Sequence, residues 1–145
     1  MKNIIMKLIK ITFIINLISI SAYANENVIG VSADIEITKL TKNELKNIFL
    51  GRKTLWDNGE PIRVGISLQN PEKLNKFLTN NIGQTQRRFK KYWLKKVFAG
   101  YGIAPKIFKD DKKALEFIGK HENSIIYISA EDMLTLKEVK TISIE

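Results

Sequence analysis

The chain has 145 residues, and its 24 Lys and Arg outnumber its 15 Asp and Glu, which gives a net charge of +9 at neutral pH. A hydrophobic fraction of 44% with 9% aromatic residues excludes an intrinsically disordered chain, and the length suits one domain. The lack of cysteine excludes disulfides, thiolate metal sites and a cysteine nucleophile, and the single histidine, His121, excludes a multi-histidine metal site.

The N-terminus has the three parts of an export signal. Residues 1–10 carry three lysines, residues 11–20 are mainly apolar, and Ala22-Tyr23-Ala24 supplies the small residues that precede a cleavage site. The apolar stretch is too short for a membrane anchor, because a spanning helix needs about 20 apolar residues. We therefore expect a signal peptide over residues 1–24, cleavage between Ala24 and Asn25, and a periplasmic domain over residues 25–145 with a net charge of +6.

The first half of this domain alternates between strands and helices. Residues 28–31 form an apolar run that predicts a buried strand. Thr41 and Glu44 have the spacing of a capping box, so a helix begins there, and Gly51 is placed to end it in a left-handed conformation. Residues 62–67 alternate between apolar and other residues, which predicts a second strand.

The second half continues the same alternation. Asn70 and Pro71 are typical of a helix cap and a first helical residue, a third helix runs from about Thr85 to Phe98, and Asp110-Asp111 caps a fourth. The expected buried stripe of the third helix consists of Phe89, Tyr92, Trp93 and Val97, and the spacing also allows Phe98 to belong to it. Residues 125–128 and 139–144 supply further strands. The alternation predicts an α/β fold with a mixed, mostly parallel sheet flanked by helices.

One segment carries a resemblance to a known family. Residues 40–52, LTKNELKNIFLGR, followed by Trp56 and Gly59, resemble a stretch of phosphate ABC transporter substrate-binding proteins of the type II periplasmic-binding-protein fold, and the similarity continues to NSIIYI at residues 123–128. The resemblance implies a single lobe of that fold. It also implies a non-enzymatic role in the uptake or sensing of phosphate or another small oxyanion, with a transporter or sensor membrane component as partner.

The chain departs from this family at the turn where the two-lobed receptors hold phosphate. Their Ser-Gly-Thr is replaced by SLQNP at residues 67–71, where the proline removes a backbone donor, and Ile126 replaces the glycine of the closing motif. A helix N-terminus still favours an anion there. The candidate anion-binding residues are Ser67, Gln69, Asn70, Arg63 and Arg52. The alternative is that Asn70 only caps the helix while Ser67 ends the strand. A homodimer would supply the opposing half that one lobe lacks.

The third predicted helix contains six cations and no acid between residues 87 and 96. Arg87, Lys91 and Lys95 recur at one-turn spacing, and Arg88 lies beside them. These four residues form either an ordinary solvated face or a surface for anionic lipid or an acidic protein. The second interpretation makes the chain an envelope adaptor that has lost ligand capture. Export argues against nucleic acid as a partner.

No group of residues suggests catalysis or a cofactor. His121 follows the fourth helix, where a cation favours the helix end, and the acid pairs at 110–111 and 131–132 precede helix-like stretches and are interpreted as caps. Trp56 is expected to pack in the core or over the first helix. A nucleophile, a base and an orienting group are not combined anywhere. We therefore predict a protein that is not an enzyme and has no metal or cofactor.

Overall fold

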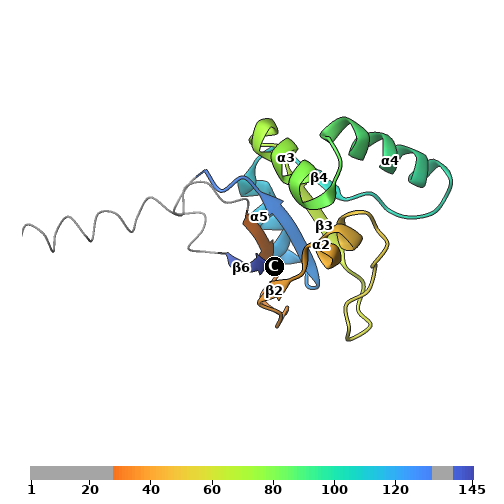
Figure 1. The fold of residues 1–145 in the computed structure, drawn as a ribbon. Coiled ribbons are helices and arrows are strands. Elements are labelled where there is room, and N and C mark those ends of the chain that lie inside the picture. Colours follow the sequence, from red (N-terminus) through yellow and green to blue (C-terminus); the bar gives the residue numbers. More distant parts are fainter. Residues whose placement is uncertain (1–27, 132–138) are drawn as a thin grey trace, which may run out of the picture.

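The computed structural model describes residues 28–131 and 139–145, in which six strands form one sheet with the order β2-β6-β1-β5-β3-β4 (Figure 1). The strands are β1 (Val28–Val31), β2 (Lys39–Leu40), β3 (Arg63–Ser67), β4 (Lys106–Phe108), β5 (Ser124–Ile128) and β6 (Lys140–Ile144). β1 pairs antiparallel with β5 and β6, and the other three pairings are parallel. Five strands therefore point one way, which confirms the mixed, mostly parallel sheet.

Helices cover both faces of this sheet. They are α2 (Lys42–Phe49), α3 (Pro71–Phe77), the π-helical turn η1 (Leu78–Ile82), α4 (Gln86–Phe98) and α5 (Asp111–Lys120). Along β5, Ile125 and Tyr127 pack with α2, α3 and η1, whereas Ile126 and Ile128 pack with α5. Both faces of the central strand are buried because side chains alternate along a strand. The result is a three-layer α/β arrangement.

The capping box of α2 forms as its sequence predicts. The Thr41 hydroxyl accepts a hydrogen bond from the Glu44 N–H at 3.2 Å, and the Thr41 N–H donates to the Glu44 carboxylate at 2.9 Å. Just beyond the other end of the helix, Gly51 has φ of 61°. A Cβ atom at Gly51 would lie 2.5 Å from the Trp93 ring, so both backbone conformation and packing require glycine.

We expect Thr41→Ala to lower the free energy of unfolding by about 0.5–2 kcal/mol at neutral pH, because the lost hydroxyl accepts from the Glu44 N–H and donates to the Glu44 carboxylate, while the backbone N–H at position 41 remains. The hydrogen bond from the Thr41 hydroxyl, aided by that from its N–H, holds the pKa of Glu44 below the usual 4.5. The part of the stabilisation that comes from the Glu44 carboxylate is therefore complete above pH 4.5 and is lost as the pH falls through the lowered pKa. Urea titration at neutral and acidic pH measures it; an effect that grows on acidification would contradict this cap.

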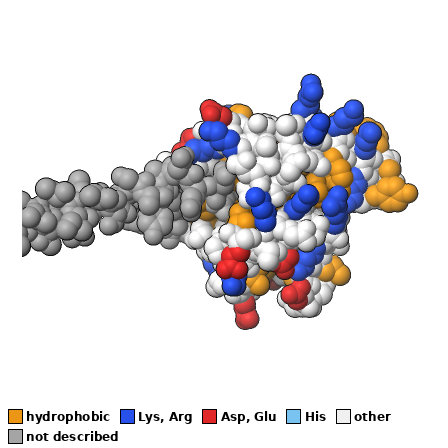
Figure 2. Space-filling view, viewed as in Figure 1, with side chains coloured by type: hydrophobic (Ala, Val, Ile, Leu, Met, Phe, Trp, Pro, Cys, Tyr) orange, Lys and Arg blue, Asp and Glu red, His pale blue; other side chains and the backbone are white. Residues whose placement is uncertain are grey.

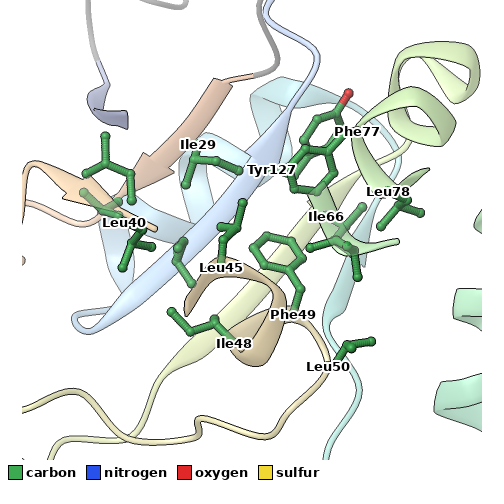
Figure 3. Packing of buried hydrophobic residues seen from close by; sticks show 14 of the residues in the cluster. Ile29, Leu40, Leu45, Ile48, Phe49, Leu50, Ile66, Phe77, Leu78 and Tyr127 are labelled. Carbon is green, nitrogen blue, oxygen red and sulfur yellow. The ribbon is translucent and has the colours of Figure 1, made fainter. Parts of the chain in front are cut away.

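The core on the α2 side is organised around aromatic rings. Figure 3 shows Phe77 beside Tyr127, with Phe49 below them. The Phe77 ring stacks on Tyr127 with a centroid separation of 4.4 Å and meets Phe49 edge-on at 5.4 Å. Edge-on and offset-stacked rings are the favoured geometries for such pairs. Phe77 thereby fixes α3 to both α2 and β5, and it sets the position of the turn that precedes α3.

The apolar stripe expected along α4 is only partly correct. Phe89 and Trp93 are buried, but Val97 is 46% exposed and Phe98 is 88% exposed. In Figure 1 the second half of α4 extends away from the sheet, so the core ends before these residues. Val97 and Phe98 therefore belong to the surface.

Part of what was expected lies outside the described residues, namely the export signal over residues 1–24 and the acid at position 132. No helix within the described part of the chain has the length and apolar character needed to cross a membrane.

Candidate functional site

The carboxyl ends of the parallel strands gather the polar groups of interest. β3 ends at Ser67 and α3 begins four residues later, while β4 leads into α5 in the same way. Because β3, β4 and β5 are parallel, the N-termini of α3 and α5 meet the loop after β5 at one edge of the sheet. In open α/β sheets, ligands bind at this edge.

Ser67 and Gln69 shape the turn from within. Ser67 is fully buried, and its Oγ accepts a hydrogen bond from the Gln69 N–H at 3.2 Å. The Gln69 side-chain oxygen accepts from the N–H of Asp111, the first residue of α5, at 2.9 Å. Gln69 thus links the two helix N-termini. Ser67 stabilises the turn from inside the protein through this hydrogen bond, and its buried side chain cannot contact a ligand in solvent.

Asn70 has two roles, because its side-chain oxygen and nitrogen point to different partners. The Oδ1 atom accepts from the Lys73 N–H at 3.0 Å and caps α3, as the sequence predicts. The Nδ2 group donates to a carboxylate oxygen of Glu131, which lies in the loop after β5. The hydrogen bond from Asn70, opposed by desolvation and reinforced by Gln69 and the charge of Lys73, lowers the pKa of Glu131. The turn therefore binds an exposed carboxylate that belongs to the chain itself.

Asp111 holds the loop that carries this carboxylate. The Asp111 side chain is buried and accepts hydrogen bonds from the Ser129 N–H at 3.2 Å, the Ser129 hydroxyl at 2.9 Å and the Ala130 N–H at 3.0 Å. Ala130 has φ of 51°, a left-handed conformation that costs a non-glycine residue roughly 1–2 kcal/mol. Asp110 caps α5, as predicted, whereas Asp111 fixes the loop after β5. The sequence interpretation of Asp111 as a cap was therefore incomplete.

The two arginines proposed to supply charge do not join this turn. Arg63 begins β3, so about 13 Å of extended strand separates it from Ser67, and its guanidinium donates to the Glu122 carbonyl at 2.7 Å. Arg52 follows the C-terminal end of α2, and within the described residues its side chain makes no hydrogen bond or ion pair. Lys73, which was not among the residues predicted from the sequence, lies in the first turn of α3, acts on the Glu131 carboxylate through its charge, and donates to the Ser129 carbonyl at 3.4 Å.

α4 is attached to the C-terminal end of α2 by its side chains. The Trp93 indole donates to the Phe49 carbonyl at 3.1 Å, and the Tyr92 hydroxyl donates to the Leu50 carbonyl at 2.7 Å. The Lys96 ammonium donates to the carbonyls of Leu50 and Gly51 at 3.0 and 2.7 Å. These carbonyls lie at and just beyond the C-terminal end of α2, where backbone acceptors lack intrahelical partners. α4 therefore has a defined position although it extends from the body of the protein.

The outer face of α4 carries the four cations singled out in the sequence. Arg87, Arg88, Lys91 and Lys95 are exposed, and within the described residues none of their side chains makes a hydrogen bond or ion pair. Figure 2 shows basic side chains at the end of the molecule that carries α4, with hydrophobic side chains at the extremity. The structure thus brings these cations together on one exposed surface.

The inner side of α4 borders an apolar groove of about 480 Å³. Its walls come from α3, α4 and β4, and they include Leu74, Leu94, Val97, Phe98 and Ile107. A larger open hollow of about 1060 Å³ lies between α5 and the residues after β1, away from the turn at Asn70. The groove is continuous with the exposed apolar end of α4, because Leu94, Val97 and Phe98 belong to both.

Trp56 and His121 stabilise the fold through contacts with backbone carbonyls. Trp56 is buried, and its indole donates to the Asn123 carbonyl at 3.1 Å, in agreement with the expected core packing. His121 caps the C-terminal end of α5, with Nδ1 2.9 Å from the Phe117 carbonyl oxygen. Within residues 28–131 and 139–145, no cluster of three or more histidine and acidic residues could hold a metal ion.

The chain has the fold of phosphate-receptor proteins. One similar solved structure is PstS from Borrelia burgdorferi, with a TM-score of 0.60 and 16% identity; the match covers 82% of this chain and 47% of that one. Another is an ABC-type phosphate transport receptor from Vibrio cholerae, with a TM-score of 0.58 and 16% identity; the match covers 81% of this chain and 45% of that one. A third is a putative phosphate ABC transporter substrate-binding protein with bound phosphate from Clostridium perfringens, with a TM-score of 0.57 and 15% identity; the match covers 81% of this chain and 45% of that one. This chain therefore spans less than half of their length, which corresponds to a single lobe. No protein-family model and no curated protein matches the chain.

Proposed function

We propose that this chain is an exported, non-enzymatic binding protein for phosphate or another small oxyanion, acting in uptake or sensing with a membrane transporter or sensor component. The observation that carries the proposal is the pair of groups around the Glu131 carboxylate, namely the Asn70 amide and the Lys73 charge. The fold shared with phosphate receptors is further support. In this proposal, residues 1–24 are removed between Ala24 and Asn25.

In this proposal, the Glu131 carboxylate occupies the position at the turn that an anionic ligand would take. Carboxylate and phosphate oxygens accept hydrogen bonds from the same amide and ammonium donors. Glu131 is exposed at the protein surface, so its side chain has room to leave the turn. A free oxyanion entering the turn would replace Glu131 as the acceptor for Asn70. The site would then consist of Gln69, Asn70 and Lys73, with Ser67 as support.

One lobe alone limits the affinity. An anion held from one side stays partly hydrated, and here it also competes with an internal carboxylate. We expect a dissociation constant of millimolar order or weaker for a monomer, which corresponds to about −4 kcal/mol. A homodimer that places two such turns opposite each other would enclose the anion and bind it more tightly.

Calorimetric titration with phosphate tests the proposal. The informative variant is Asn70→Asp, because its carboxylate still caps α3 while the Nδ2 donor is lost and a negative charge is added. We expect weak phosphate binding in the parent chain and none in Asn70→Asp, with unfolding midpoints that stay similar. Sedimentation analysis of the same samples shows whether tight binding occurs only in dimers.

Two outcomes would contradict the proposal. Phosphate binding of equal strength in Asn70→Asp would place the site elsewhere. Micromolar binding by a strict monomer would mean that a second half of the site exists in this chain. Arg63→Gln serves as the control, since it removes a positive charge about 13 Å away along β3, and it should leave phosphate binding unchanged.

The second candidate function is an envelope adaptor that acts through the basic face of α4. The specific observation in its favour is the set of four exposed cations without partners in the described residues, Arg87, Arg88, Lys91 and Lys95. An adaptor would not need the turn at Asn70. Absence of phosphate binding in every variant and oligomeric state would favour this function.

A further inference from the structure

The segment from Lys73, within α3, to Lys109, just before α5, combines an extreme charge bias with exposed apolar side chains. Residues 73–109 contain ten Lys and Arg and no Asp or Glu. The net charge of this segment is therefore +10, compared with +9 for the whole chain. Among the described residues, the same segment contains most of the large apolar side chains that are strongly exposed. These are Leu94, Val97, Phe98, Tyr101, Ile103 and Ile107.

The two kinds of side chain are arranged as they are in a protein that lies on a membrane surface. Phe98, Tyr101 and Ile103 are 88%, 77% and 93% exposed. They lie at the end of α4 and in the loop after it, which extend away from the sheet in Figure 1. We name these three residues the apolar tip. Cations along a helix next to exposed aromatic and aliphatic residues are typical of interfacial membrane binding.

We propose that α4 and the apolar tip bind the surface of an anionic phospholipid bilayer. The tip enters the boundary between headgroups and acyl chains, and Arg87, Arg88, Lys91 and Lys95 contact the anionic headgroups. The bonds from Trp93 and Lys96 to the end of α2 hold α4 in place, so the tip is presented by a fixed helix. This surface is separate from the turn at Asn70, and the proposal does not depend on oxyanion binding.

The composition of the surface favours lipid over an acidic protein. Eight of the ten cations in residues 73–109 are lysines. Lysine is depleted in protein–protein interfaces, whereas clusters of four to eight Lys or Arg are typical of binding to anionic lipids. A second copy of this chain would bring two segments of high positive charge together, which is unfavourable. The convex, almost fully exposed tip also fits a deformable surface.

Co-sedimentation with phospholipid vesicles tests the proposal. The vesicles are phosphatidylcholine with and without phosphatidylglycerol, and every variant carries the same N-terminus, whose contribution therefore cancels. We expect binding to the anionic vesicles only. It should weaken as salt rises from about 0.1 M to about 1 M, because the screening length falls from ~10 to ~3 Å.

Three variants separate the contributions. Replacing the four basic-face residues by glutamine should lower the partition coefficient by about a hundredfold or more, since each cation near an anionic surface contributes roughly fivefold and the four factors multiply. The double variant Phe98→Ser/Ile103→Ser should lower the partition coefficient to a similar extent. This variant should fold as the parent does, because both side chains are exposed. The matched control replaces four exposed lysines elsewhere by glutamine and should bind nearly as the parent does. These are Lys42, Lys112, Lys113 and Lys120.

Several results would overturn the proposal. Equal binding to neutral and anionic vesicles, or equal losses in the basic-face variant and the control, would mean that the position of the charges is irrelevant. No binding to anionic vesicles at about 0.1 M salt would assign the surface to a protein partner. Circular dichroism and urea midpoints of each variant establish that a loss of binding is not a loss of folding.

Discussion

Replacing Phe77 with alanine should lower the free energy of unfolding by about 3–5 kcal/mol, the usual range for truncation of a buried phenylalanine. The Phe77 side chain has no exposed surface, and its ring contacts both Tyr127 and Phe49. Because these three rings come from α3, β5 and α2, the cavity would border three elements that cannot all move to fill it. Urea titration, with the slope of the transition checked for constancy, measures the loss.

Phe98→Ala is the matched control for this variant. The same atoms are removed, but the Phe98 side chain is 88% exposed, so the free energy of unfolding should stay within about 0.5 kcal/mol of the parent value. Similar losses in both variants would show that the Phe98 side chain also packs against the body of the protein and that the loss in Phe77→Ala is not specific to the core.

The second large effect is expected for Asp111→Ala, with a loss of about 3 kcal/mol in the free energy of unfolding. Three donors of Ser129 and Ala130 would lose their acceptor in a place where water has little access. Ala130 would also keep its left-handed conformation without the hydrogen bond that supports it. Urea titration measures the loss, and Asp111→Asn should be intermediate because an amide retains one acceptor oxygen.

Asp110→Ala separates this loop contact from helix capping. Asp110 caps α5 by accepting from the Lys113 N–H at 2.9 Å, so its removal should cost about 1 kcal/mol. If Asp111→Ala cost no more than Asp110→Ala, Asp111 would contribute only as a first-turn acid, and the loop that carries Glu131 would be held by other contacts.

Local signals in the sequence predicted most of the secondary structure. The capping box at Thr41, the left-handed Gly51 and the Asn70-Pro71 helix start each depend on residues within one or two turns, and all three are confirmed. β2 and β4 were not predicted, because strands of two and three residues are too short to show alternation. Their existence depends on pairing with β6 and β3.

The candidate site was predicted only in part, for the same physical reason. The turn at Asn70 follows from local sequence, but its partner Glu131 lies 61 residues away and its approach depends on strand order. The distance of Arg63 from the turn could have been inferred, since four residues of strand span about 13 Å. Val97 was assigned to the core, and Phe98 was allowed there, because helical spacing cannot show where the sheet beneath a helix ends.

The most direct test of an oxyanion site occupied by the chain's own carboxylate is a phosphate titration of Glu131→Gln beside the parent chain. Glu72→Gln is the matched control, because it removes the same charge from the first turn of α3, where Glu72 pairs with Lys76. If Glu131 occupies the site, phosphate should bind Glu131→Gln about tenfold or more tightly than it binds the parent chain, while Glu72→Gln should change the affinity by no more than about twofold, the effect of a screened surface charge. Equal affinities in the parent chain and both variants, or equal gains in the two variants, would contradict a site at Asn70 that Glu131 fills.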